Sequence, residues 1–173
     1  MSDAERRAYV VGLGANLGDR RETLRSALST LGSCGVIVAV SDLYETGAVG
    51  PPQPDYLNAA VLLESVLTPR GLLGGLLAVE RAHGRVRLER WGPRTLDLDL
   101  LHSPDLVVME PDLTLPHPEL ARRPFALLPL LDVLPDARDA QSGALYSDIV
   151  RALPTGDVRR LEARNSWYPG RAE

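Results

Sequence analysis

A strictly alternating stretch in the middle of the chain constrains the fold more than any other feature. Leucines stand at positions 96, 98 and 100, and Thr95, Asp97 and Asp99 occupy the places around them. Alternation with a period of two predicts a half-buried strand, with the leucines on one face and the polar side chains on the other. Residues two apart on a strand lie roughly 6.5–7 Å from each other. We therefore expect Asp97 and Asp99 to lie side by side.

These two aspartates are the first candidates for a metal site. Two carboxylates held so close repel each other unless a cation lies between or beside them. Magnesium suits such oxygen ligands and binds one or two carboxylates together with substrate phosphates. Arginines at 85, 87, 90 and 94 precede the strand, and guanidinium groups beside metal-binding acids suggest phosphoryl chemistry. The alternative is a solvated strand face on which Arg94 pairs with Asp97.

Composition narrows the classes of function. A net charge of −4 argues against bulk nucleic-acid binding. All 19 basic residues are arginine, which excludes a Walker-type lysine, a Schiff-base lysine and a kinase strand lysine. The single cysteine permits no internal disulfide. The polar start and the absence of a long apolar run predict a cytoplasmic protein without a membrane span.

Hydrophobic periodicity and turn residues predict a mixed order of strands and helices. Helices are expected to begin after two N-caps, Asp19 with Glu22 three residues later, and Thr68 followed by Pro69. The predicted strands cover residues 9–14, 36–40 with a continuation to 44, 56–64, 95–101, 106–108 and 158–161. The predicted helices cover 20–32, 69–83, 126–131 and 145–153. The polar tail, 163–173, is expected to be poorly ordered, with Trp167 and Tyr168 as its docking points.

Two polar side chains stand where apolar ones are expected. Asn58 interrupts a buried strand, and a buried amide needs hydrogen-bond partners, which either a ligand or the protein itself can supply. Glu80 extends the apolar stripe of the second helix, so it either reaches solvent or points into a site. The glycines at 12, 14 and 18 lack dinucleotide-binding spacing and are expected to allow close packing of strand and turn.

Four runs of sequence, at 12–18, 53–59, 90–99 and 115–118, resemble the hydroxymethyldihydropterin pyrophosphokinases of folate biosynthesis. The resemblance covers about residues 9–153 and implies an α+β, ferredoxin-like sandwich with a central, mainly antiparallel sheet and helices on both faces. It implies one catalytic domain over 1–173, with 154–173 as a C-terminal extension. The implied reaction transfers pyrophosphate from ATP to the hydroxymethyl group of 6-hydroxymethyl-7,8-dihydropterin and releases AMP.

The resemblance also implies roles for individual residues. Asp97 and Asp99 correspond to the ligands of two magnesium ions, and Arg85 and Arg94 to a catalytic pair that binds phosphate. The implied pterin contacts are Thr46, Gly47, Val49, Tyr56, Asn58, Trp91 and Phe125. The implied ATP contacts are Glu80, Arg87, Leu100, Thr114, His117 and Arg123. Small-molecule substrates, a monomer, and no nucleic-acid or membrane partner are expected.

Some positions depart from the family pattern, and two other functions stay open at this point. Leu77 and Asp112 stand where polar and basic residues, respectively, can contact the nucleotide. The first alternative is another magnesium-dependent phosphotransferase or nucleotidyltransferase with the same paired acids. The second is a non-catalytic ferredoxin-like binding module, which a low aromatic content of 5% and the negative charge disfavour.

Overall fold

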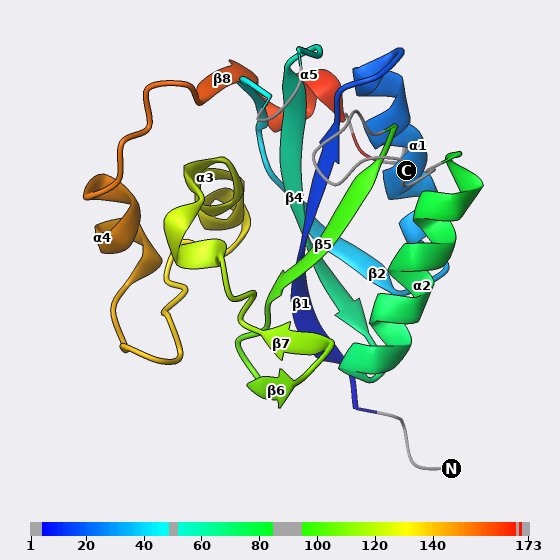
Figure 1. Ribbon diagram of the computed structural model, residues 1–173. Coiled ribbons are helices and arrows are strands. Elements are labelled where there is room, and N and C mark those ends of the chain that lie inside the picture. The colour runs from blue at the N-terminus through cyan, green and yellow to red at the C-terminus, as the bar shows by residue number, and fades with distance from the viewer. Residues whose placement is uncertain (1–4, 49–51, 85–94, 169, 171–173) are drawn as a thin grey trace.

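The computed structural model describes residues 5–48, 52–84, 95–168 and 170. Within these ranges the main sheet has six strands, and a separate two-stranded hairpin lies at its lower end in Figure 1. The strands are β1 (Arg7–Ala15), β2 (Val36–Val40), β3 (Leu43–Thr46), β4 (Tyr56–Ser65), β5 (Asp97–His102), β6 (Val108–Glu110), β7 (Leu113–Leu115) and β8 (Arg159–Glu162). The helices are α1 (Arg20–Leu31), α2 (Pro69–Ala82), the 3-10 turn η1 (Leu120–Arg122), α3 (Pro124–Val133), α4 (Tyr146–Arg151) and α5 (Arg164–Trp167).

In the described residues the strands of the main sheet pair antiparallel, in the order β5-β1-β4-β3-β8, and β2 also pairs with β4. β1 lies between β4 and β5. Its Gly14 stands opposite Asn58 on one side and opposite Asp97 on the other. Because directly opposed residues point to the same face, the register aligns Asp97, Gly14 and Asn58 across three strands.

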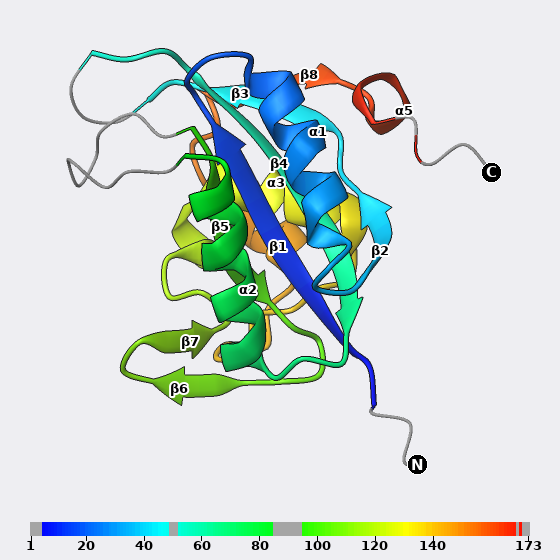
Figure 2. The same cartoon turned by 90° about the vertical axis from the view of Figure 1, so that its right-hand side faces the viewer.

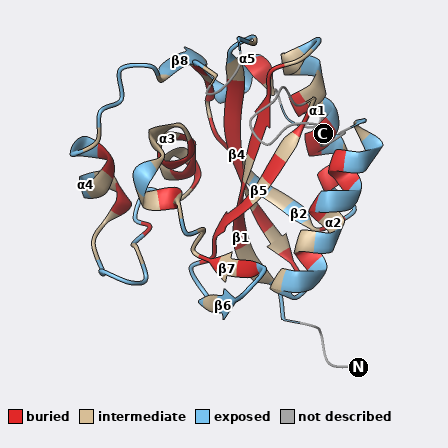
Figure 3. Cartoon of the chain, in the orientation of Figure 1, coloured by how far each residue is buried: buried red, intermediate tan, exposed pale blue. Residues whose placement is uncertain are grey.

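Helices cover both faces of the sheet (Figures 1 and 2). One face packs against α1 and α2 through side chains such as Leu13, Leu28 and Leu76, all buried. The other packs against α3, where Val10 and Leu127 belong to a second apolar cluster. Figure 3 shows the burial concentrated on the sheet strands and on the inward sides of the helices. The predicted α+β sandwich is confirmed.

Both predicted helix caps are present. The Asp19 side chain accepts a hydrogen bond from the backbone N–H of Glu22, at 3.1 Å, and α1 begins at the next residue after Asp19. The Thr68 hydroxyl accepts from the backbone N–H of Gly71, also at 3.1 Å, and Pro69 is the first residue of α2. These local signals could be read from sequence because a cap acts within four residues of itself.

The predicted strand from 36 to 44 is divided into two, β2 and β3. Ser41 lies at the break, where its backbone N–H donates to the Ala60 carbonyl (2.9 Å) and its hydroxyl accepts from the Ala60 N–H (2.8 Å). The Ser41 hydroxyl thus replaces a backbone carbonyl as the acceptor for the Ala60 N–H. The two short strands, β2 and β3, both pair with β4. The predicted strand at 106–108 is displaced to β6, and its partner β7 was not predicted.

The C-terminal segment is more ordered than expected over the residues that the structure describes. β8 forms an edge strand against β3, as predicted. The prediction of poor order is wrong for 164–168, because Trp167 is fully buried and its indole N–H donates to the Ser41 carbonyl at 3.0 Å. The expectation that Trp167 is a docking point of the tail is confirmed. In the described part of the chain, no helix is both long enough and apolar enough to cross a bilayer.

Candidate active site

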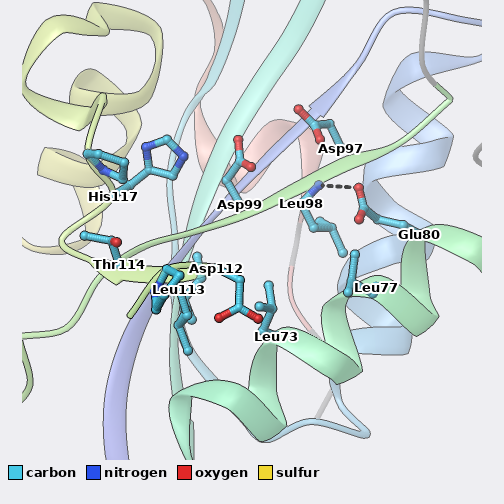
Figure 4. Close-up of a pocket in the computed structure, with 13 residues that line it drawn as sticks. Leu73, Leu77, Glu80, Asp97, Leu98, Asp99, Asp112, Leu113, Thr114 and His117 are labelled. Atoms are coloured by element: carbon cyan, nitrogen blue, oxygen red, sulfur yellow. Dashed lines mark hydrogen bonds between the residues drawn. The ribbon is translucent and has the colours of Figure 1, made fainter. Parts of the chain in front are cut away.

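A cavity of about 420 Å³ opens beside β5, which is the edge strand of the main sheet. Its walls come from α2, from β5 and from the segment that holds the β6–β7 hairpin (Figure 4). Because β5 lies at the sheet edge, residues from both of its faces reach the cavity. Six of the residues expected at the site line it: Glu80, Asp97, Asp99, Leu100, Thr114 and His117.

The paired aspartates occupy the positions that the alternation predicts. Asp97 and Asp99 are half-buried, and Figure 4 shows both on the upper side of β5, with their carboxylates clear of the leucine face. The leucines at 96, 98 and 100 are buried on the opposite face. Within the described ranges, no group of three or more histidine, cysteine, aspartate or glutamate side chains is arranged to hold a metal ion. Asp97 and Asp99 can supply two carboxylates to a cation, and a magnesium ion bound in this way takes its remaining ligands from water and substrate phosphates.

The structure decides between the two alternatives for Glu80, a side chain that reaches solvent or one that points into a site. The residue is 2% exposed, so it does not reach out to bulk solvent. Its Oε2 accepts a hydrogen bond from the backbone N–H of Leu98, at 3.3 Å (Figure 4). Leu98 lies between the two aspartates, so α2 is joined to β5 at the point from which both carboxylates project.

His117 is held by its own backbone and by a neighbour. Its N–H donates to the Leu101 carbonyl at 2.8 Å, and its Nδ1 accepts from the backbone N–H of Glu119 at 3.1 Å. Burial lowers the pKa of His117, the nearby Arg123 guanidinium lowers it further, and the Glu119 and Asp97 carboxylates act in the opposite direction. The ring is therefore neutral at pH 7, and because Nδ1 accepts, its proton is on Nε2, which can donate to a ligand.

A second group of expected residues lies outside the cavity, on the sheet face that carries the aspartates. Asn58 is 7% exposed, and its amide Nδ2 donates to the Thr46 hydroxyl at 3.0 Å. Between Asn58 and Asp97 lies Gly14, where an added Cβ would meet Asn58 Oδ1 at 3.4 Å and the Tyr56 ring at 3.5 Å. Gly14 therefore places no side chain of its own between the amide and the carboxylate. The predicted close packing at the glycines is found at Gly12, where an added Cβ would meet Leu101 Cδ1 at 2.9 Å, whereas the contacts at Gly14 are ordinary and nothing lies within 4 Å of Gly18.

Phe125 and Arg123 lie at the start of α3, also outside the cavity. The Arg123 guanidinium lies over the Phe125 ring, 5.8 Å from its centroid. Phe125 is half-buried, so part of its ring remains accessible. Gly47 follows β3 and is exposed. Five further expected residues lie outside the described residues: Val49, Arg85, Arg87, Trp91 and Arg94.

Sequence reasoning missed part of the apolar wall. Leu73, Leu98, Pro111 and Leu113 line the cavity together with Leu77, Asp112 and Pro118. The helical spacing of Leu73 and Leu77 relative to Glu80 was visible in the sequence, and it could have placed both on the cavity side. Pro111 and Leu113 could not be found in this way, because their positions depend on a hairpin that was not predicted.

Comparison with solved structures defines the class of fold. The chain superposes on a Plasmodium falciparum HPPK-DHPS triple mutant with pteroate at a TM-score of 0.71, with 14% identity, over 92% of this chain and 47% of that one. Wild-type P. falciparum HPPK-DHPS with pterin and p-hydroxybenzoate gives a TM-score of 0.68 at 15% identity, over 87% and 44%. The chain thus spans about half the length of these solved chains and shares the ferredoxin-like α+β fold of part of them.

Sequence comparison then identifies the family. The model of 7,8-dihydro-6-hydroxymethylpterin-pyrophosphokinase (HPPK) matches residues 10–135. The 2-amino-4-hydroxy-6-hydroxymethyldihydropteridine pyrophosphokinase of Synechocystis sp. is 48% identical over 146 residues, which cover 83% of this chain and 75% of the relative. The Pseudomonas aeruginosa enzyme of the same description is 40% identical over 158 residues, covering 90% and 96%.

The chain belongs to the HPPK family and is a pyrophosphokinase of folate biosynthesis. Both the family and the reaction class expected from the four sequence runs are confirmed. Membership sets aside the two alternatives, a different phosphotransferase or nucleotidyltransferase and a non-catalytic binding module. The roles of individual residues and the identity of the metal are separate questions.

Proposed function

We propose that this chain transfers the pyrophosphoryl group of ATP to the hydroxymethyl oxygen of 6-hydroxymethyl-7,8-dihydropterin and releases AMP, with Asp97 and Asp99 as ligands of two magnesium ions. In this reaction the hydroxymethyl oxygen bonds to the β-phosphorus, the bond from that phosphorus to the bridging oxygen breaks, and the oxygen leaves with AMP. The observation that carries the proposal is the pair of half-buried aspartates beside a cavity whose remaining wall is largely apolar.

The cavity suits the nucleotide. Its volume of about 420 Å³ falls within the range of about 300–1,000 Å³ that small-molecule sites occupy. Leu73, Leu77 and Leu113 provide an apolar wall for a flat base. Thr114 and the neutral His117 add hydrogen-bonding groups on the side of the cavity away from Leu73 and Leu77, and so can orient the sugar and phosphates (Figure 4).

Two carboxylates on one strand face fit magnesium. Magnesium typically keeps several waters and takes only one or two carboxylates, with substrate phosphates completing its octahedron. Among the described residues, no third acidic, histidine or cysteine side chain joins the two aspartates in a group that could hold a metal ion, which agrees with that ligand set. When bound, the metal supplies charge neutralisation on the triphosphate and a lower pKa for the attacking hydroxyl.

The pterin is assigned to the sheet face across Gly14 from Asp97. Asn58 can pair its amide with the polar edge of the pterin, while Thr46 accepts one amide hydrogen and so fixes which way the amide faces. Tyr56 and Phe125 provide flat apolar surface for the bicyclic ring. Strands pair about 4.8 Å apart, so a group bound near Asn58 lies within two strand spacings of the metal ligands.

The remaining assignments rest on sequence resemblance. Arg85 and Arg94 are proposed to neutralise phosphate charge, Arg87 and Arg123 to contact ATP, and Trp91, Gly47 and Val49 to contact the pterin. Glu80 and Leu100 are placed on the ATP side, in agreement with their position in the cavity wall. Phosphoryl transfer is achieved mainly by positioning and charge stabilisation, which this set of residues can provide.

The test is a product analysis. The purified chain is incubated with ATP, magnesium chloride and 6-hydroxymethyl-7,8-dihydropterin, and nucleotides are separated by anion exchange. We expect one AMP per pterin consumed and no reaction after chelation of magnesium. Asp97→Ala and Asp99→Ala should each lower the rate by about a hundredfold or more, whereas Asp148→Ala, on the exposed face of α4, should not. ADP or free pyrophosphate as the nucleotide-derived product would overturn the proposal.

A further inference from the structure

Arg70 joins the two opposite walls of the cavity. It is the second residue of α2, and Asp112 lies in the turn between β6 and β7. The guanidinium contacts Asp112 in a two-pronged arrangement, Nη1 to Oδ2 and Nη2 to Oδ1, each at 2.9 Å. Nη2 also contacts Glu110 Oε2, at the end of β6. Among the described residues, Arg70 supplies the ion pairs between α2 and the hairpin.

The segments that Arg70 joins are those that form the cavity. Leu73 follows it by three residues on α2, and Leu113 and Thr114 follow Asp112 directly. Figure 4 shows Asp112 and Leu73 facing each other across the lower end of the cavity. A change in the spacing of α2 and the hairpin would therefore change the width of the space between the leucine walls.

The ion pairs of Arg70 also change the net charge at the rim of the cavity. Without Arg70, Glu110 and Asp112 would place two negative charges at the rim of a site assigned to a polyanionic nucleotide. The Arg70 guanidinium, through its hydrogen bonds, lowers the pKa of the Asp112 carboxyl. The carboxyl therefore stays ionised and paired throughout the neutral range.

We propose that Arg70 and Asp112 form a clamp that fixes the width of the nucleotide cavity and so sets the affinity for ATP. Neither residue needs to touch the reacting atoms, so both act as positioning residues. The proposal rests on the assignment of ATP to this cavity. A planar guanidinium that binds a carboxylate through two parallel hydrogen bonds constrains geometry more than a single-point contact does, which suits this role.

A simpler account, in which only the net charge at the rim matters, predicts a different pattern. On that account Arg70→Ala weakens ATP binding because it removes a positive charge, and Asp112→Asn strengthens it because it removes a negative one. A clamp predicts that both substitutions weaken binding. It also predicts that the double variant is no weaker than Arg70→Ala alone, because partners of one contact are not additive.

The experiment measures the Kd of a non-hydrolysable ATP analogue with magnesium by calorimetry, and the KM values for ATP and pterin, in each variant. We expect Arg70→Ala and Asp112→Asn each to raise the Kd and the KM for ATP by roughly two- to fivefold, with little change in the KM for pterin. Arg70→Lys keeps the charge without the fork and should fall between Arg70→Ala and the parent chain. Arg151→Ala breaks the exposed ion pair with Asp148 on α4 and is the matched control.

Exchange of the partners provides the decisive variant. Arg70→Asp combined with Asp112→Arg restores a pair of opposite charges and should recover most of the affinity lost in Arg70→Asp alone. Tighter binding by Asp112→Asn, unchanged binding in all variants, or an exchanged pair as weak as Arg70→Asp would overturn the clamp. If the parent chain binds no ATP analogue, the assignment of the cavity fails and the clamp fails with it, whereas normal binding by every variant defeats the clamp alone.

Discussion

The buried carboxylate of Glu80 accepts a hydrogen bond from the backbone N–H of Leu98, the residue between Asp97 and Asp99. The contact joins α2 to the edge strand of the sheet at the point where the candidate metal ligands project. Within the described residues β5 pairs with β1 alone, and on its other side the Glu80 side chain takes part of the place of a second strand. The arrangement couples the stability of β5 to the geometry of the candidate site.

We expect Glu80→Ala to lower the free energy of unfolding by about 1–3 kcal/mol, because it leaves the Leu98 N–H without its acceptor. The same substitution should raise the KM for ATP, since β5 loses a constraint beside the aspartates. Urea unfolding and steady-state kinetics measure the two effects. Arg81→Ala, on the exposed side of the same helix, is the control and should alter neither. A Glu80→Ala chain with unchanged kinetics would separate this contact from the site.

Asn58→Ala should raise the KM for pterin by about tenfold and leave the KM for ATP unchanged, because the amide lies on the pterin side of Gly14. Thr46→Val keeps the volume of the side chain but removes the hydroxyl that accepts from Asn58. It should give a smaller increase, since the amide remains but loses its orientation. Equal effects of Asn58→Ala on both substrates would contradict the division of the site into two halves.

Trp167→Ala should lower the free energy of unfolding by about 3–5 kcal/mol, as expected when a large aromatic side chain is removed from a core. It would also leave the Ser41 carbonyl without the indole donor. Leu161→Ala, at a half-exposed position on the neighbouring β8, should cost much less and is the control. Thermal or urea unfolding provides the measurement, and a loss no larger than that of Leu161→Ala would show that the tail is not part of the core.

The burial of His102 leads us to predict that the free energy of unfolding decreases on acidification. It is buried, its Nδ1 has no hydrogen-bond partner among the described residues, and its ring meets Tyr146 edge-on at 5.6 Å. Burial lowers the pKa of His102, and the Asp139 carboxylate partly opposes the shift. Below the unfolded-state pKa the unfolded chain binds a proton that the folded chain does not, so stability is full above about pH 6.5 and decreases below it.

The expected limiting slope from one such histidine is about 1.4 kcal/mol per pH unit. His102→Phe keeps an aromatic ring against Tyr146 and removes the titrating group. The loss of stability between pH 7.5 and pH 5.5, measured by urea unfolding at constant ionic strength, should therefore be smaller in His102→Phe than in the parent chain. His117 contributes in the same direction, so some loss remains. Identical losses in the two chains would exclude His102 as a source of acid sensitivity.

Sequence patterns predicted the helices and strands that are determined by residues close to each other in the chain. Asp19 and Thr68 cap their helices through side chains that act within one turn. The alternation around Asp97 corresponds to the two faces of β5, because the leucine face packs against the core and the aspartate face does not. The two core strands β1 and β4 could be predicted for the same reason, since each is apolar along most of its length.

The remaining features depend on contacts between distant residues. The β6–β7 hairpin has three residues in each strand and a turn through Pro111 and Asp112, so it carries too little periodicity to be recognised. The docking of Trp167 depends on Ser41, which lies 126 residues earlier. Residue roles were obtained by resemblance, and the cavity brings together four of the six expected ATP contacts, Glu80, Leu100, Thr114 and His117, but none of the described pterin contacts.

The position of Trp167 has a consequence for the order in which the protein is made. The strands that carry Asp97, Asp99 and Asn58 are complete once residue 102 has been synthesised. The last large side chain of the main core arrives 65 residues later, since translation proceeds from the N-terminus. A nascent chain can thus pair the strands that carry Asn58, Asp97 and Asp99 before Trp167 takes its place beside the Ser41 carbonyl. Until Trp167 leaves the ribosome, the main core lacks the side chain that completes it.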